Sequence, residues 1–212
     1  MTQVSINTLV QGAISGDYIV SFPTDTVPAL ATLPDRAELI FAAKRRSQDK
    51  PLILMAASAE ALWPYVHGSL AELKLWQQVA ASYWPGALTL VLPASPLVPP
   101  AMNAIDRTTI GIRVPNFPLA LKILEQTGPL ATTSANLSGQ APLESVAEIE
   151  AQFPEVLTLM PSELATVATA LIASSLPSTV AKWTGGNWEI LRQGAIELAS
   201  SPIHSDTKLY PG

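Results

Sequence analysis

The 212-residue sequence contains no cysteine. This absence excludes disulfide frameworks, thiol nucleophiles and cysteine-bound zinc clusters. The two histidines, His67 and His204, are too few and too far apart for most metal sites. We therefore assign no residue of this chain as a metal ligand.

Charged residues are also scarce, at 14% of the chain, whereas hydrophobic residues make up 48%. Extended disorder requires the opposite balance and is excluded. The net charge of -5 disfavours a general nucleic-acid coat, which needs a broad basic surface to displace counterions.

Long hydrophobic runs are missing as well. The N-terminal segment has no basic run and carries polar residues throughout, unlike a signal peptide. Apolar stretches such as ALTLVLPA are far shorter than a membrane span. We expect a cytoplasmic protein without a membrane segment.

Three common catalytic or nucleotide-binding motifs are absent from the sequence: the GxSxG elbow, the Walker loop and GxGxxG. A hydrolytic triad cannot be assembled from its Ser, His and Asp residues at useful spacing. Any nucleotide must therefore be held without the usual glycine-rich loop.

The chain does contain short apolar runs that alternate with helical spacing and are separated by prolines. This alternation predicts an α/β fold in which some neighbouring strands are antiparallel. We expect one domain over residues 1–198 and a loosely ordered C-terminal tail over 199–212. Strands are expected at 18–22, 51–55, 88–92, 109–114, 130–133, 157–160, 178–183 and 188–191, and helices from 34 and at 70–83, 118–126 and 145–152.

Polar residues at the ends of these apolar runs are the first candidates for a site. Thr24, Asp25 and Thr26 follow a buried strand, where open α/β sheets bind ligands, but this stretch taken alone favours a simple turn with an Asp or Thr cap. A basic cluster, defined here as Lys44, Arg45, Arg46 and Lys50, holds 4 of the 12 Lys and Arg residues. It suits phosphate binding or, equally, a solvated helix C-terminus.

Arg113 lies in the apolar strand TTIGIRVP and needs an anionic partner, either an internal carboxylate or a ligand. Its place at the end of the strand favours a ligand. The segment LATTSANLSG offers small hydroxyl and amide groups at another strand end, or an Asx/Ser turn. Later strand ends carry Ser178, Thr179 and Arg192.

Taken in order, these pieces resemble the YrdC-type threonylcarbamoyl-adenylate synthases of the YrdC/YwlC/YciO superfamily. The matched stretches span roughly residues 17–196 and are FPTDTV, KRR with KPL, WPGALTLVLP, TIGIRVPNFPLAL, PLATTSANLSG, STV and ILRQGAI. The resemblance implies a twisted, mixed sheet flanked by helices, with a large, positively charged concave cavity. It also implies a nucleotidyltransferase that forms threonylcarbamoyl-AMP and pyrophosphate from L-threonine, bicarbonate and ATP, for t6A modification of tRNA.

The family's functional residues carry over onto matching positions. Lys44 and Arg46 would be catalytic, and ATP would contact Lys44, Arg46, Thr109, Ser134, Asn136 and Arg192. Threonine would contact Thr24, Arg113, Thr132 and Ser178, with Arg113 meeting its carboxylate. Mg²⁺ would arrive with ATP, without assigned protein ligands, and tRNA or t6A-transfer proteins are the implied partners.

Some positions depart from the family's pattern. Pro28 and Ala29 replace an aromatic and a glycine, Ser47 a common proline, Pro177 an acidic residue, and Lys182 lies near a customary Asp. These changes flank the threonine side, so they bear on the amino-acid substrate. Two alternatives therefore stay open: a non-catalytic relative that binds tRNA or double-stranded RNA, and a module for another nucleotide or amino acid.

Overall fold

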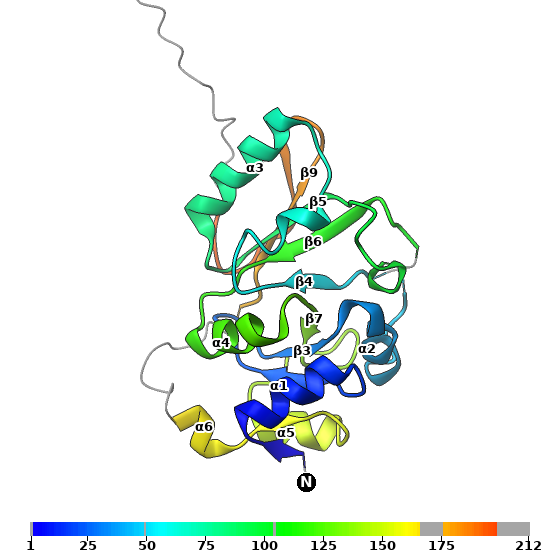
Figure 1. Ribbon diagram of the computed structural model, residues 1–212, viewed down its shortest axis with the longest axis vertical. Coiled ribbons are helices and arrows are strands. Elements are labelled where there is room, and N and C mark those ends of the chain that lie inside the picture. Colours follow the sequence, from blue (N-terminus) through cyan, green and yellow to red (C-terminus); the bar gives the residue numbers. More distant parts are fainter. Residues whose placement is uncertain (1, 49, 104, 166–175, 199–212) are drawn as a thin grey trace, which may run out of the picture.

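The computed structural model describes residues 2–48, 50–103, 105–165 and 176–198, and a mixed β-sheet forms its centre (Figure 1). In the described part of the chain this sheet has eight strands in the order β10-β9-β5-β6-β4-β7-β3-β2. The pairs β4–β6 and β5–β9 are parallel and the other neighbours are antiparallel. A separate parallel pair joins β1 to β8. The strands are β1 (Gln3–Val4), β2 (Val20–Phe22), β3 (Ala29–Thr32), β4 (Ile53–Met55), β5 (Leu88–Pro93), β6 (Thr109–Arg113), β7 (Leu130–Ser134), β8 (Thr158–Leu159), β9 (Thr179–Trp183) and β10 (Trp188–Arg192).

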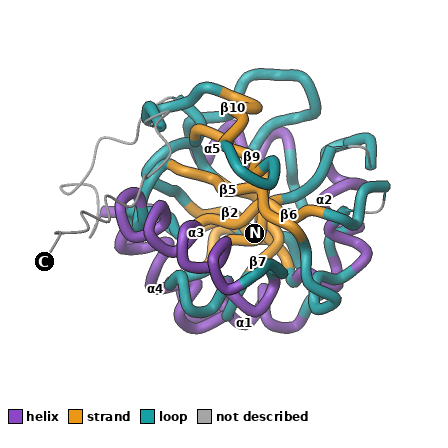
Figure 2. The backbone as a smooth tube through the Cα atoms, turned by 90° about the horizontal axis from the view of Figure 1, so that it is seen from above, coloured by secondary structure: helices purple, strands orange, loops and turns teal. Residues whose placement is uncertain are grey.

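Helices surround the sheet, as the view from above shows (Figure 2). They are α1 (Ile6–Ser15), α2 (Glu38–Ala43), α3 (Leu70–Tyr83), α4 (Pro118–Thr127), α5 (Val146–Gln152) and α6 (Pro161–Ala165). Capping boxes start α3 at Ser69 and α5 at Ser145, each closed by a glutamate three residues later. Helix α1 ends at Gly16, whose φ of 72° suits a residue without a Cβ.

The hydrophobic core and the polar face lie on opposite sides of the central strands. Because successive side chains on a strand point to opposite faces, each strand supplies both. The core receives Leu88, Leu90, Leu92, Ile110, Ile112, Leu54, Ala131, Ala181 and Trp183. The alternate positions of the same strands, such as Thr89, Gly111 and Val180, line a cavity instead.

The expected α/β class with a mixed sheet is confirmed. Each expected strand and helix is present within a few residues, and α3 matches its expected bounds. The sequence interpretation missed β1, α1, β3 and α6. Helix α1 buries Ile6, Leu9, Val10 and Ala13 at helical spacing, so the same pattern argument applies to it.

The expected tail, residues 199–212, lies outside the described residues, and the domain extent 1–198 stays a prediction. Among the helices that the structure describes, none combines the length and the hydrophobicity that a membrane crossing requires.

Candidate active site

A cavity of about 400 Å³ opens on the polar face of the sheet. Its floor is formed by alternate residues of β4, β5, β6 and β9 and by Thr132–Ser134 of β7. Its walls include the loops at 24–28, 51–52 and 177–178, together with Asn103, Ile105 and Asp106. Gly111 lies in the floor, where an added Cβ would come within 3.5 Å of Ile53 and Thr89. The volume is in the range typical of small-molecule sites.

Most of the residues implied by the resemblance line this one cavity. They are Thr24, Arg46, Thr109, Arg113, Thr132, Ser134, Ser178 and Arg192. Lys44 and Asn136 are not among its lining residues, because both are buried directly behind Ser134. These eight residues come from six separate segments, more than 160 positions apart at the extremes, and line one cavity.

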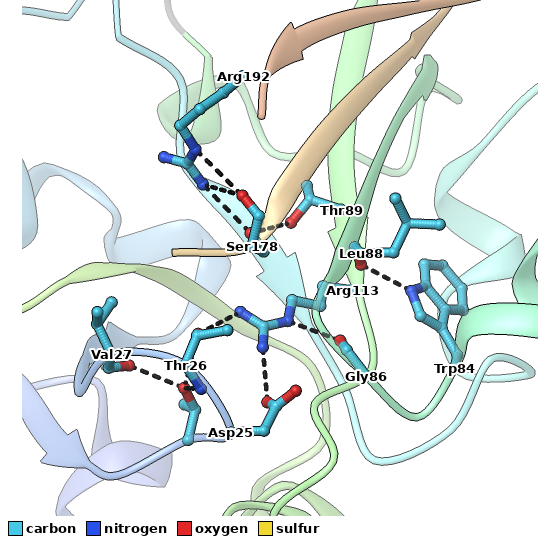
Figure 3. Close-up of polar contacts among 11 residues, drawn as sticks. Asp25, Thr26, Val27, Trp84, Gly86, Leu88, Thr89, Arg113, Ser178 and Arg192 are labelled. Carbon is cyan, nitrogen blue, oxygen red and sulfur yellow. Dashed lines mark hydrogen bonds and ion pairs between the residues drawn. The ribbon is translucent and has the colours of Figure 1, made fainter. Parts of the chain in front are cut away.

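Arg113 is the most buried cation of the cavity, with 4% of its surface exposed. Its Nη2 forms an ion pair of 2.6 Å with Asp25, Nη1 donates to Thr26 Oγ1 and Nε donates to the Gly86 carbonyl (Figure 3). Burial lowers the pKa of Arg113, Asp25 opposes that shift, and the charge of Arg192 adds to it. Of the two partners that the sequence leaves open, the internal carboxylate is present, so Arg113 does not depend on a ligand for its counter-charge. Contact with a ligand through its remaining N–H groups stays a prediction.

The loop around Asp25 is both a turn and part of the cavity wall, so the two interpretations of FPTDTV, a simple turn and a strand end beside a ligand site, are compatible. Thr24 Oγ1 donates to the Val27 carbonyl at 2.8 Å and accepts from the Thr26 N–H at 3.1 Å, which is the geometry of a hydroxyl-stabilised turn. The same turn aims Asp25 and Thr26 at Arg113. The turn is therefore the device that builds this side of the cavity.

Arg192 lies across the cavity mouth at the end of β10. Its Nε and Nη2 donate to the Ser178 carbonyl at 3.1 and 2.9 Å, and Nη2 also donates to Ser178 Oγ at 3.2 Å. Within the described ranges no carboxylate lies within ion-pair distance of this guanidinium. Partial burial lowers its pKa, so an anion bound there would be stabilised by an otherwise uncompensated charge.

Lys44 follows α2 and ties it to the segment after β7. Its Nζ donates to the Ser134 carbonyl and to Asn136 Oδ1, which also accepts from Ser134 Oγ at 2.6 Å. Asn136 Nδ2 in turn donates to the carbonyls of Leu137 and Gln140. Only 1% of Lys44 is exposed, so the interpretation of the basic cluster as a solvated helix C-terminus is wrong for this residue.

Burial, followed by the charge of Arg46, lowers the pKa of Lys44 from 10.5 to about 7. Between those two pH values the unfolded chain holds more protons than the folded one, so rising pH favours the folded state. We expect the stability of the wild-type protein relative to Lys44→Met to increase by about 2–3 kcal/mol between pH 6 and pH 9. Urea unfolding of both proteins across this range measures it, and a difference that does not change with pH would contradict the shifted pKa.

The other members of the basic cluster differ in placement. Arg46 lines the cavity, and its guanidinium donates to the carbonyls of Lys50 and Pro51 at 3.0 and 3.2 Å. Arg45 is exposed, has a φ of 48° and is not among the lining residues. The basic cluster is therefore divided between a residue that lines the cavity, Arg46, and a solvated one, Arg45, and phosphate binding stays a prediction.

Sequence reasoning missed several lining residues, among them Thr89, Asn103, Ile105 and Asp106. Thr89 could have been found from the pattern of LTLVL, where three leucines occupy one face and leave Thr89 and Val91 on the other. The charge of the lining is positive, since Arg46, Arg113, Lys182 and Arg192 oppose a single carboxylate, Asp106, among the described lining residues.

Comparison with known proteins agrees with this geometry. The Sua5/YciO/YrdC family model, described as telomere recombination, matches residues 12–194. A threonylcarbamoyl-AMP synthase of Klebsiella pneumoniae is 36% identical over 145 residues, which are 66% of this chain and 75% of that protein. This chain belongs to the Sua5/YciO/YrdC family.

Solved structures of the Sua5/YciO/YrdC family share the fold. P. abyssi Sua5, solved in complex with L-threonine, is 30% identical with a TM-score of 0.74, covering 89% of this chain and 54% of that one. This chain thus spans about half of that Sua5. E. coli YciO has the same TM-score at 23% identity, covering 92% of this chain and 91% of that one, and is evidence for the fold alone.

The departures from the Sua5/YciO/YrdC pattern are now placed. Pro28, Ala29, Pro177 and Lys182 all line the cavity, whereas Ser47 is exposed and does not. The substitutions therefore alter the wall that a small substrate would touch and leave the Ser134–Asn136 segment intact.

Proposed function

We propose that this chain is a threonylcarbamoyl-AMP synthase, a nucleotidyltransferase that uses L-threonine, bicarbonate and ATP. The observation that carries the proposal is the convergence of Arg46, Arg113, Ser134 and Arg192 on one cavity of positive charge. Three anionic groups meet in this reaction: a triphosphate, a carboxylate and a carbamate. A preorganised set of cations and hydroxyls is what such a reaction requires.

The chemistry needs no nucleophilic side chain. The amine of threonine, after losing one proton from its ammonium form, combines with bicarbonate to give the carbamate and water. A carbamate oxygen then attacks the α-phosphorus of ATP, the bond to the β-phosphate oxygen breaks, and pyrophosphate leaves. The protein would hold the two reactants in line and neutralise the phosphate charge.

On the phosphate side, Arg46 would contact the triphosphate. The Ser134 hydroxyl would join it by turning its hydrogen from Asn136 Oδ1 to a phosphate oxygen. Lys44 would act from behind, by holding Ser134 and Asn136 in place through the hydrogen bonds described above. On the other side, the two N–H groups of Arg113 that its internal partners do not use would meet the amino-acid substrate.

Mg²⁺ is the cofactor that the resemblance implies. Among the described residues no three His, Asp or Glu side chains cluster as a metal site, and Asp106 is the only acidic residue of the described lining. Mg²⁺ commonly takes one or two carboxylates with phosphate oxygens and waters, so this donor set fits an ion bound to ATP with Asp106 nearby. Bound there, the ion would supply charge neutralisation of the phosphates.

The proposed product would be consumed by t6A modification of tRNA, with tRNA and the transfer proteins as downstream partners, in the cytoplasm. The 36% identity to a threonylcarbamoyl-AMP synthase supports the activity. Because the residues that depart from the family pattern line the cavity wall, the test must establish which amino acid is the substrate.

The direct test is pyrophosphate release from ATP by the purified protein with bicarbonate and Mg²⁺. We expect release that depends on L-threonine and exceeds that with L-serine or L-valine, because the site must select one amino acid. Arg46→Ala serves as the inactive control. Release that another amino acid supports better would reassign the substrate, and ATP binding without release would indicate a non-catalytic nucleotide-binding relative.

A further inference from the structure

Thr89 lies in the middle of the cavity floor, although no residue pattern in the sequence assigns it a role. It is on β5, is 0% exposed, and its Oγ1 lies 2.9 Å from Ser178 Oγ, the first residue before β9 (Figure 3). Ser178 is 2% exposed and lines the cavity. The two hydroxyls share one hydrogen bond, in which either oxygen could be the donor by distance alone.

Hydrogen counting identifies the donor. If Ser178 donated to Thr89, the hydroxyl hydrogen of Thr89 would have no acceptor among the described residues, within a site that water does not reach. A buried donor without an acceptor costs on the order of 1–3 kcal/mol. Donation from Thr89 to Ser178 avoids that cost, since the hydrogen of Ser178 can then reach the open cavity.

Arg192 points to the same direction of donation. A guanidinium can only donate, and its Nη2 donates to Ser178 Oγ at 3.2 Å. With Thr89 as the second donor, both acceptor positions of Ser178 Oγ are filled. The hydrogen of Ser178 then has one place to go, which is toward a ligand in the cavity.

The group that accepts this hydrogen must be an oxygen, and the surrounding charge favours an anionic one. Arg192 has no carboxylate partner in the described part of the chain, and its positive charge contributes to the lowered pKa of Arg113. Ser134, on the phosphate side, is on β7, four strand spacings from β9 in the sheet order, or about 19 Å along a flat sheet. A carboxylate oxygen is therefore a better match for Ser178 than the distal phosphates.

We infer that Thr89 is a positioning residue that fixes the Ser178 hydroxyl as a donor to a carboxylate oxygen of the substrate. The inference rests on the proposed function for the identity of that substrate. Two sources share this chemistry, the α-carboxylate of threonine and the carboxylate of bicarbonate that becomes the carbamate.

Steady-state kinetics of Thr89→Val and Thr89→Ser test the inference. Valine keeps the shape of threonine without its hydroxyl. Ser178 Oγ then loses one of its two donors, so its own hydrogen is no longer held in the direction of the cavity. We expect the KM for threonine or for bicarbonate to rise about tenfold, the scale of a weakened hydrogen bond to a charged group, with kcat and the KM for ATP within about twofold. Thr89→Ser should restore the wild-type KM.

Thr32→Val is the matched control. Thr32 is also fully buried on a strand, and its hydroxyl donates to the Tyr18 carbonyl, outside the cavity lining. A rise in the threonine KM alone identifies the α-carboxylate as the ligand of Ser178, and a rise in the bicarbonate KM alone identifies the carbamate group. An unchanged KM for both, a rise for ATP alone, or the same rise in Thr32→Val overturns the inference.

A binding measurement separates this inference from the proposed function. L-threonine and bicarbonate are each titrated calorimetrically into the wild-type protein and Thr89→Val without ATP. If the wild-type protein releases no pyrophosphate but Thr89→Val binds a carboxylate ligand more weakly than wild type, the positioning role is supported and the synthase activity is rejected. Turnover with unchanged carboxylate binding and KM rejects the positioning role and keeps the synthase, and a wild-type protein that neither binds nor turns over rejects both.

Discussion

Arg46→Ala should release pyrophosphate about 30- to 1000-fold more slowly than the wild-type protein while staying folded. One preorganised charged contact to the transition state contributes about 2–4 kcal/mol, which corresponds to that range of rates. The fold should survive because the Arg46 guanidinium donates to the backbone carbonyls of Lys50 and Pro51, which lie in an exposed segment. Pyrophosphate release at saturating substrates and a thermal melt measure the two quantities.

Arg45→Ala is the matched control, since it removes the same charge from the neighbouring position. Arg45 is exposed and does not line the cavity. We expect its rate within about twofold of wild type, because exposed charges at this range are screened by salt. Equal losses in both variants would mean that the basic cluster acts through its general field, and unfolding of Arg46→Ala would make its role structural.

Asp25→Ala should lower the free energy of unfolding by about 3 kcal/mol, the largest stability loss that we expect from a cavity residue. The substitution leaves the guanidinium of Arg113 buried without its carboxylate, and breaking one side of a buried pair has an effect of that size. Urea unfolding at neutral pH measures it. The threonine KM should rise as well, because Arg113 would lose its fixed orientation.

A double variant isolates the cause. Asp25→Ala combined with Arg113→Met should recover more than half of the lost stability, because no buried charge then remains. Asp35→Ala, at an exposed aspartate, should change stability by less than about 0.5 kcal/mol. If the double variant is as unstable as Asp25→Ala, the ion pair is not the source of the loss.

The sequence predicted the elements whose apolar pattern is strong and whose ends carry Pro or Gly. Strands β5 and β6 have leucine or isoleucine at alternate positions, and helix α3 buries Trp76, Val79 and Ala80 at helical spacing between its Ser69 cap and Pro85. Strand β3 was missed because ALAT has small side chains and directly follows Pro28, which resembles a loop. Its pairing with β2 and β7 provides the stability that the local sequence does not.

The sequence predicted which residues line the candidate site better than it predicted which partners those residues contact. The cations and hydroxyls follow from the matched motifs, and most of them line the cavity. Which charges pair internally depends on long-range geometry: Asp25 and Arg113 are 88 positions apart, and Lys44 and Asn136 are 92 apart. No local pattern encodes such pairs, so the internal partner of Arg113 and the burial of Lys44 emerged only from the fold.

The alternation along β5, β6 and β9 separates two tasks between neighbouring residues. One set of side chains packs in the core and the intervening set lines the cavity. A single substitution at Gly111, Val91, Val180 or Lys182 can therefore change the shape of the cavity without disturbing the core packing beneath it. A protein with such a cavity floor can change its amino-acid substrate by single substitutions. The departures of this chain at the cavity wall are substitutions of this kind.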